Sequence, residues 1–300
     1  MLPSFPSGAR VAFIGDSITA ANLTLPRVIH AYKELCLSSG IRFFNCGVAG
    51  GTAAFALKSY DTDIARYAPT HAVVSFGIND SNRHYLLNPR SPMRLAMLEA
   101  SFEGYKKSLR ALIERLLSDG VQVILCTPVP YDEYTVSDEP ALRGGFALML
   151  GYAEYVRGLA RELGVTLYDQ HAILSEALSS DNIISEDHIH PNEHGYFVLA
   201  RKFLREQGIA IGAEVPVPEY FAEWHSRVAR LRKVLAAECM IIPDFNAPTE
   251  EKLRIMKEKI EREDWGQPVF ESFIRHYVED KPNEEWLYSE IDRLYEKDIF

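Results

Sequence analysis

Ser17 is the first residue of this sequence that could do covalent chemistry. It follows an apolar run in the stretch "VAFIGDSITA", where the run ends in Gly15, Asp16 and Ser17. A serine hydroxyl becomes a nucleophile where a neighbouring base accepts its proton. The same stretch is also typical of an ordinary helix start, in which Ser or Asp caps the helix and Gly permits the turn. Ser17 alone is consistent with either role.

A base and a carboxylate that could activate this serine stand together late in the sequence. The stretch "SEDHIHPNEHGY" places Asp187 three residues before His190. Serine acyl transfer needs a histidine to accept the hydroxyl proton and a carboxylate to hold that histidine in the correct tautomer. At this spacing Asp187 can bond to Nδ1 of His190 and direct Nε2 outward. The pair therefore supports nucleophilic chemistry at Ser17.

Two further stretches could supply an oxyanion hole. The first, "NCGVAGGTA", contains Gly47, Gly50 and Gly51. Each of these glycines lets the backbone approach a ligand closely and point an N–H at it. The second, "FGIND", carries Asn79 directly after an apolar run, with a side-chain amide that could donate a hydrogen bond. The backbone amide of Ser17 would be a third donor.

Strand and helix patterns alternate along the first two-thirds of the chain. We expect strands over 10–15, 41–46, 71–76, 121–126 and 165–169, and helices near 26–38, 53–66, 93–118, 145–163 and 193–207. Nearly continuous apolar runs are typical of strands covered on both faces. Repeated strand–helix–strand units predict a parallel, doubly wound sheet in three layers. Active sites of such sheets lie beyond the carboxyl ends of the strands, which is where Ser17 and Asn79 fall.

Four short blocks follow one another in this α/β region: "GDSI" at 15–18, "NCGVAG" at 45–50, "GIND" at 77–80 and "DHIHP" at 187–191. In these blocks the sequence resembles the SGNH hydrolases, also called GDSL-type esterases and lipases. The resemblance covers roughly residues 10–208. It implies a flavodoxin-like three-layer α/β/α sandwich with a five-stranded parallel sheet, and a serine esterase that uses no metal and no other cofactor.

The resemblance also implies roles for individual residues. Ser17 would be the nucleophile, and His190 the base that Asp187 orients. The oxyanion would be held by the amides of Ser17 and Gly50 and by the side chain of Asn79. Four further residues could line the substrate site: Asp16, Tyr85, Tyr131 and His188.

We expect the substrate to be a short acyl ester, preferably an acetyl ester of a carbohydrate or another small polar alcohol, cleaved through an acyl-enzyme. A lysophospholipase-type or thioesterase-type acyl hydrolase of the same family is the alternative. Tyr85 and Tyr131 lie in the loops 81–92 and 128–140, which follow strand ends. Their rings could stack on a sugar or could pack these loops.

Other classes of function compete with the serine esterase. A metal-dependent hydrolase could use the cluster His188, His190 and His194, although the HExxH motif is absent. A nucleotide-binding module could use "GVAGGT", which lacks the GK[ST] ending of a P-loop. A non-catalytic carbohydrate-binding protein on the same fold would have no need to retain Ser, His and Asp together.

Bulk properties narrow the choice of partners. The 300 residues carry a formal net charge of −10, which disfavours binding to nucleic acid and to anionic membranes. No apolar run approaches the ~20 residues of a membrane span, and the first residues lack the pattern of a signal peptide. We therefore expect a cytoplasmic enzyme whose partner is a small-molecule ester.

The charge and the secondary-structure pattern of the chain change after residue 212. Residues 214–300 hold 13 Lys and Arg against 20 Asp and Glu, so −7 of the net charge of −10 lies there. Amphipathic helical patterns replace the strand patterns. We expect an SGNH hydrolase domain over 1–212 and an acidic, mainly helical extension over 213–300, which packs on that domain, caps its site or forms a homo-oligomer.

Overall fold

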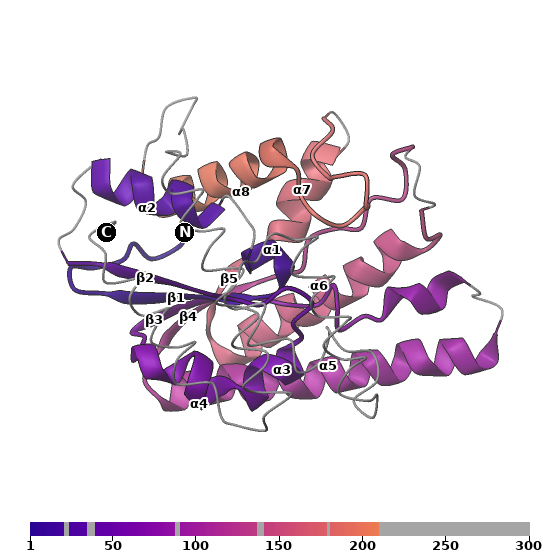
Figure 1. Ribbon diagram of the computed structural model, residues 1–300, viewed down its shortest axis with the longest axis horizontal. Coiled ribbons are helices and arrows are strands. Elements are labelled where there is room, and N and C mark those ends of the chain that lie inside the picture. The colour runs from indigo at the N-terminus through magenta and orange to yellow at the C-terminus, as the bar shows by residue number, and fades with distance from the viewer. Residues whose placement is uncertain (21–23, 35–39, 88–90, 137–140, 179–180, 210–300) are drawn as a thin grey trace, which may run out of the picture.

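The computed structural model describes residues 1–209, apart from the short segments 21–23, 35–39, 88–90, 137–140 and 179–180 (Figure 1). The helical extension expected over 213–300, and the homo-oligomer surface expected there, lie outside the described residues. Within the described part of the chain, no helix is both long and apolar enough to cross a lipid bilayer.

Five parallel strands form the centre of the fold, in the order β2-β1-β3-β4-β5 (Figure 1). Their bounds are β1 Arg10–Gly15, β2 Arg42–Gly47, β3 His71–Ser75, β4 Gln122–Cys126 and β5 Thr166–Tyr168. Each strand lies within one residue of the one expected from the sequence. The order is that of the flavodoxin-like fold, in which ligands bind at the β1/β3 switch point. The expected fold class is confirmed.

The strands end level with one another at one edge of the sheet. Gly15 of β1 pairs in register with Gly47 of β2 and with Ser75 of β3. Ser75 in turn pairs with Cys126 of β4. The loops that leave these ends therefore begin close together, although they are far apart in sequence.

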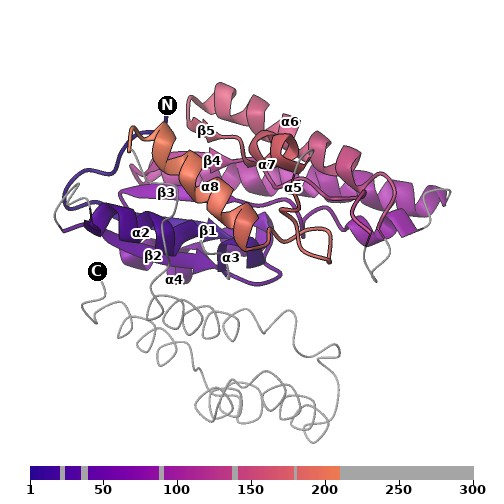
Figure 2. The ribbon, with the colours of Figure 1, turned by 90° about the horizontal axis from the view of Figure 1, so that it is seen from above.

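Helices cover both faces of the sheet (Figures 1 and 2). One layer contains α2 Thr24–Glu34, α7 Gln170–Leu178 and α8 Glu193–Glu206, and α8 packs against both of the others. The second layer contains α3 Ala53–Lys58, α4 Tyr60–Asp63, α5 Pro92–Ser118 and α6 Gly145–Leu163, and α5 packs against α3 and α6. Covered on both faces, the strands bury Val11, Ile14 and Val74 completely.

The helix expected over 53–66 is broken at Ser59. The Ser59 amide closes α3 by donating to Phe55 O at 2.9 Å, and its hydroxyl donates to the same oxygen at 3.2 Å. Serine side chains that bond back to the preceding turn favour a bend in the helix. The segment continues as α4 and the 3₁₀ turn η1, Ala65–Tyr67.

The helix α7 is not apparent in the sequence pattern. It has nine residues, of which only His171 and Leu174 are fully buried. Two buried positions are too few to establish a helical period, so the segment resembles a loop in the sequence.

The short helix α1, Ser17–Ala20, lies directly on the ends of β1 and β2. A Cβ atom on Gly15 would lie 2.1 Å from Thr19 Oγ1, and one on Gly47 would lie 2.3 Å from the amide nitrogen of Ala20. Only glycine fits at such distances. These two glycines therefore let the helix start against the edge of the sheet.

Candidate active site

Ser17, His190 and Asp187 form one hydrogen-bonded chain at the carboxyl edge of the sheet. Ser17 begins α1 directly after β1, and its Oγ lies 2.7 Å from Nε2 of His190. Nδ1 of the same imidazole is hydrogen-bonded to Oδ2 of Asp187. The side chains of His190 and Asp187 are 32% and 37% exposed, so a substrate can reach these two residues from solvent.

The Asp187 carboxylate is held by its own turn as well as by the imidazole. Its Oδ1 accepts hydrogen bonds from the amides of Ile189 and His190, at 3.1 and 3.0 Å. Burial raises the pKa of Asp187, but the hydrogen bonds from His190 and Ile189 outweigh burial and leave the pKa at about 2. An ionised carboxylate at Nδ1 keeps the imidazole proton on that nitrogen. Nε2 is then able to accept the proton of Ser17.

The loops that carry Gly50 and Asn79 meet beside the end of β1. In the loop after β2, the Val48 amide donates to Gly15 O at 2.9 Å, and Gly50 takes the left-handed conformation with φ +75°. Asn79 follows β3, and its Nδ2 donates to Gly51 O at 3.0 Å. A side-chain amide nitrogen carries two hydrogens, so the second remains for a ligand. Both expected oxyanion donors thus lie at the edge of the sheet that carries Ser17.

Asp80 ties the same two loops together. Its side chain is buried, and Oδ1 accepts a hydrogen bond from the Ala53 amide at 2.9 Å, at the start of α3. Among the described residues, Oδ2 has no hydrogen-bond partner. Burial raises the pKa of Asp80 to about 7, against the lowering effect of the Ala53 hydrogen bond. Asn79 and Asp80 therefore clamp the Gly50 loop at adjacent points.

Asp16 shapes the start of α1, the helix that begins at Ser17. It is only 3% exposed, and its Oδ1 accepts a hydrogen bond from the Ile18 amide at 2.9 Å. Burial raises the pKa of Asp16 to about 6, while the Ile18 hydrogen bond and the charge of His190 oppose that rise. Asp16 leaves little surface for a substrate, so its expected place in the lining of the site stays a prediction.

The remaining residues expected to line the site are His188, Tyr131 and Tyr85. His188 and Tyr131 are both 2% exposed and stack with ring centroids 5.8 Å apart. The Asp132 amide donates to His188 O at 2.9 Å, which joins the loop after β4 to the loop that carries the base. Tyr85 is half-buried with its ring 4.3 Å from that of His84. Their contact with substrate stays a prediction, and the burial of His188 and Tyr131 favours a supporting role.

Arg83 interacts electrostatically with Tyr131 and Asp187, although no sequence motif marks it. It begins the 3₁₀ turn η2, Arg83–Leu87, and its Nη1 donates to Ile78 O at 3.3 Å. Burial lowers the pKa of Arg83, whereas electrostatic interactions with Tyr131, Asp187 and Asp16 raise it. The only signal in the sequence is a cation in the loop after the third strand.

The histidines His188, His190 and His194 do not converge on a metal site. His190 belongs to the hydrogen-bonded chain, His188 stacks on Tyr131, and His194 lies in α8 with its ring 6.4 Å from that of Phe197. In residues 1–209 as described, no three His, Cys, Asp or Glu side chains are placed to hold a metal ion. This donor set does not fit the metal-dependent alternative.

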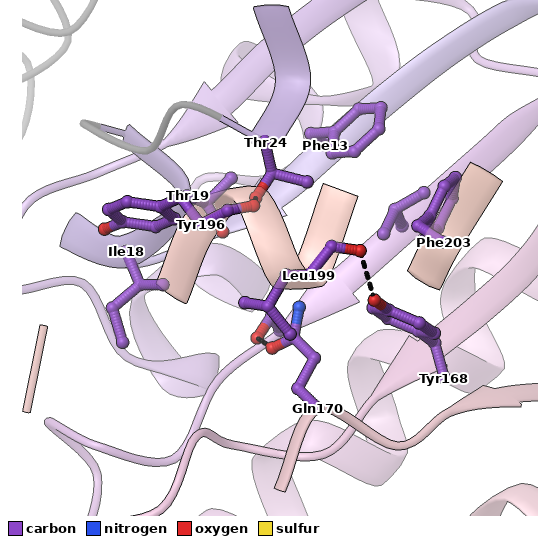
Figure 3. A pocket seen from close by; sticks show the side chains of 11 residues that line it. Phe13, Ile18, Thr19, Thr24, Tyr168, Gln170, Tyr196, Leu199 and Phe203 are labelled. Carbon is purple, nitrogen blue, oxygen red and sulfur yellow. Dashed lines mark hydrogen bonds between the residues drawn. The ribbon is translucent and has the colours of Figure 1, made fainter. Parts of the chain in front are cut away.

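A small cavity lies behind α1, enclosed by α2, α8 and the strands (Figure 3). Its polar lining includes Thr19, Ser75 and Gln170, and Tyr168 Oη donates to Leu199 O beside it at 2.6 Å. The volume is about 20 Å³, which is sufficient for about one water molecule. This cavity is too small for an acyl group or a sugar, whereas the side chains of His190 and Asp187 are partly exposed to solvent.

A model of the GDSL-like lipase/acylhydrolase family matches residues 13–197, which is more than half of the chain. The chain belongs to this family. The match includes Ser17, Gly50, Asn79, Asp187 and His190. The enzyme is accordingly a serine carboxylic ester hydrolase, as the four sequence blocks indicated.

Similar proteins agree with this assignment. An acetylxylan esterase of Geobacillus stearothermophilus is 28% identical to the enzyme over 219 residues, which cover 67% of this chain and 95% of the relative. The crystal structure of Axe2, an acetylxylan esterase from Geobacillus stearothermophilus, has a TM-score of 0.56 at 25% identity and covers 70% of this chain and 99% of that chain. LAE5, an alpha/beta hydrolase enzyme from the metagenome of Lake Arreo, Spain, shares the fold with a TM-score of 0.57 at 24% identity, over 69% of this chain and 99% of that chain.

Proposed function

We propose that the enzyme hydrolyses short-chain acyl esters, above all acetyl esters of a carbohydrate or another small polar alcohol. The observation that carries the proposal is the hydrogen-bonded chain from Ser17 Oγ to Nε2 of His190, at 2.7 Å, and on to Asp187. Membership of the lipase/acylhydrolase family supports the ester chemistry. The acetylxylan esterase among the relatives supports an acetylated carbohydrate as the substrate.

In the proposed acylation step, each group of the site has a defined role. Ser17 Oγ attacks the ester carbonyl carbon while Nε2 of His190 takes the hydroxyl proton, and Asp187 stabilises the resulting imidazolium. The carbonyl oxygen becomes an oxyanion that accepts hydrogen bonds from the Ser17 and Gly50 amides and from the second Nδ2 hydrogen of Asn79. The bond to the alcohol oxygen then breaks, and His190 gives its proton to that oxygen.

Deacylation repeats these events with water. His190 accepts a proton from a water molecule as the water oxygen attacks the acyl carbon on Ser17. The second tetrahedral intermediate collapses, the Ser17 oxygen leaves and regains the proton, and the carboxylic acid is released.

Acyl-chain preference separates this proposal from the alternative within the family. The experiment measures kcat/KM on p-nitrophenyl esters from acetate to dodecanoate, followed by acetate release from acetylated xylose and other acetylated sugars. We expect the highest kcat/KM on the acetyl ester and release of acetate from the sugars. A preference for octanoate or longer chains would instead support a lysophospholipase-type or thioesterase-type hydrolase.

A further inference from the structure

Arg83 is held against the turn that carries an oxyanion donor. Its Nη1 donates to the carbonyl oxygen of Ile78, the residue directly before Asn79, at 3.3 Å. Because η2 follows β3 at the carboxyl edge of the sheet, this bond keeps the guanidinium at the same edge as Ser17. The cation is therefore positioned by the framework of the site.

The groups around the guanidinium place it on the side of the base. It interacts electrostatically with Tyr131, with Asp187, which orients His190, and with Asp16. In serine acyl transfer the leaving alcohol must lie next to the base, since the base protonates its oxygen. Arg83, bonded to the residue before Asn79, therefore lies at the same edge of the sheet as the site that receives the alcohol half of the ester.

Most of the hydrogen-bonding capacity of Arg83 is unused by the described part of the chain. A guanidinium carries five N–H donors in a planar fork. The bond to Ile78 O is the single hydrogen bond that the Arg83 side chain makes to the described residues. The side chain is half-buried, and none of its nitrogens is among the buried atoms that lack a partner in the described part of the chain. The remaining donors therefore reach solvent and are available to a bound ligand.

The charges around Arg83 indicate which kind of ligand can accept its hydrogen bonds. Two carboxyl groups, those of Asp16 and Asp187, already interact with this one cation, and both have pKa values below neutrality, at about 6 and about 2. A further anion would meet their repulsion. Neutral hydroxyl oxygens accept hydrogen bonds without adding negative charge, and neighbouring hydroxyls match the spacing of a planar fork of donors.

We propose that Arg83 is a specificity-determining residue that donates hydrogen bonds to free hydroxyl groups on the alcohol half of the ester, as a sugar ring presents them. This inference rests on the proposed function, because it assigns the substrate class of the same site. These hydrogen bonds from Arg83 make the enzyme favour esters of polyhydroxylated alcohols over esters that carry no free hydroxyl group.

The test compares the wild type with two variants, Arg83→Gln and Arg83→Lys. Each protein is assayed on a mono-O-acetylated methyl xyloside and on p-nitrophenyl acetate, whose leaving group has no free hydroxyl. We expect Arg83→Gln to lower kcat/KM on the xyloside about tenfold to a hundredfold, the effect of losing hydrogen bonds from a charged donor. On p-nitrophenyl acetate we expect a change below about threefold, and for Arg83→Lys an intermediate loss on the xyloside.

Arg161→Gln is the matched control. Arg161 also makes one hydrogen bond to a backbone carbonyl, that of Arg157 at 3.4 Å, but it lies exposed in the last turn of α6, at the opposite edge of the sheet. We expect this variant to match the wild type on both substrates.

Several outcomes would overturn the inference. An equal loss of kcat/KM on both substrates would make Arg83 a support for the Asn79 turn, and no loss on either would leave it without a role in specificity. A loss confined to esters that bear a carboxylate would make it an anion site. If the wild type cleaves p-nitrophenyl acetate but no acetylated sugar, the carbohydrate part of the proposed function fails. Glycerol monoacetate against ethyl acetate then tests Arg83 separately, and failure to prefer the glycerol ester would contradict the inference.

Discussion

At the residue scale, Ser17 meets the groups proposed to activate it although they are remote in sequence. Nε2 of His190 lies 2.7 Å from its hydroxyl although 173 positions separate the two residues. Asp187 is ionised far below neutral pH, because its pKa is about 2, so the imidazole it holds keeps one tautomer across the physiological range. A serine without these partners would be as unreactive as any hydroxyl at a helix start.

Replacing Ser17 tests its role as the nucleophile. We expect Ser17→Ala to abolish ester hydrolysis and to prevent covalent labelling by a fluorophosphonate probe, since no hydroxyl remains to form the adduct. Ser101→Ala, on α5, removes a hydroxyl that bonds to Met97 O and should leave both readouts unchanged. Persistent labelling of Ser17→Ala would show that another residue is the nucleophile.

Replacing Asn79 tests the oxyanion hole. Loss of one oxyanion donor typically lowers kcat about 10²-fold to 10³-fold, and we expect that loss for Asn79→Ala. Asn82→Ala is the control, because Asn82 lies three residues further on and donates to Ser101 Oγ at 3.0 Å instead. Far-ultraviolet circular dichroism checks that both variants fold. Near-normal turnover by Asn79→Ala would exclude this amide from the oxyanion hole.

At the scale of elements, the position of α1 depends on how closely it approaches the sheet. Gly15 and Gly47 carry no side chain at the points where α1 touches β1 and β2. The loops after β2 and β3 are joined to each other by the Asn79 and Asp80 side chains, at 3.0 and 2.9 Å. The geometry of the site is therefore a property of packed elements, in which each loop limits the position of the next.

Gly47→Ala tests this close packing. Its new methyl group would lie 2.3 Å from the Ala20 amide nitrogen, which belongs to backbone and can move only with α1. We expect lower kcat, because displacing α1 moves Ser17, the proposed nucleophile, and a lower melting temperature from overpacking. Gly151→Ala on α6 is the matched control, since no atom lies within 4 Å of the added methyl group. Helix propensity should make that control slightly more stable than wild type. Wild-type kcat in Gly47→Ala would contradict the argument.

At the scale of the whole molecule, a buried histidine links stability to pH. His171 is 2% exposed, its Nδ1 lies 3.2 Å from Ser175 Oγ, and its Nε2 has no hydrogen-bond partner in the described chain. Burial lowers its pKa to about 4, with a further lowering by the charge of Arg157. The unfolded chain keeps the ordinary value of about 6.5. Between these values the unfolded state binds more protons, so stability falls as the pH is lowered.

We expect His171 to remove about 2 to 3 kcal/mol from the free energy of unfolding between pH 7.5 and pH 4.5. Urea denaturation at both pH values measures this for wild type and for His171→Gln, which cannot take up a proton. The variant should lose less stability than wild type over the same interval. An identical pH dependence in the two proteins would show that His171 does not contribute.

The oligomeric state is also a property of the whole molecule. Homo-oligomerisation through residues 213–300 stays a proposal, supported by the amphipathic patterns of that segment. Light scattering on the full chain measures the mass in solution, and a monomer at all concentrations would contradict the proposal.

The sequence by itself determined the fold class, the family and the order of the strands along the chain. Apolar runs mark buried strands because both faces of this sheet are covered, and each strand was therefore found to within one residue. Motifs such as "GDSI" and "DHIHP" are local, so Ser17, Asp187 and His190 could be named from them. The meeting of Ser17 with His190 followed from the family resemblance, since no local rule connects the two stretches.

Only the tertiary structure decided what surrounds those residues. The packing of α7 on α8 and the burial of His188 against Tyr131 depend on contacts between segments distant in sequence, which no periodicity records. The break at Ser59 depends on a side-chain hydrogen bond to Phe55 O, which an apolar pattern does not record either. Arg83 is one cation in the loop after β3 until the Ile78 carbonyl holds it beside the turn that carries Asn79. The physical reason is that burial and electrostatic environment arise where several loops converge, and the sheet establishes that convergence only when the chain folds.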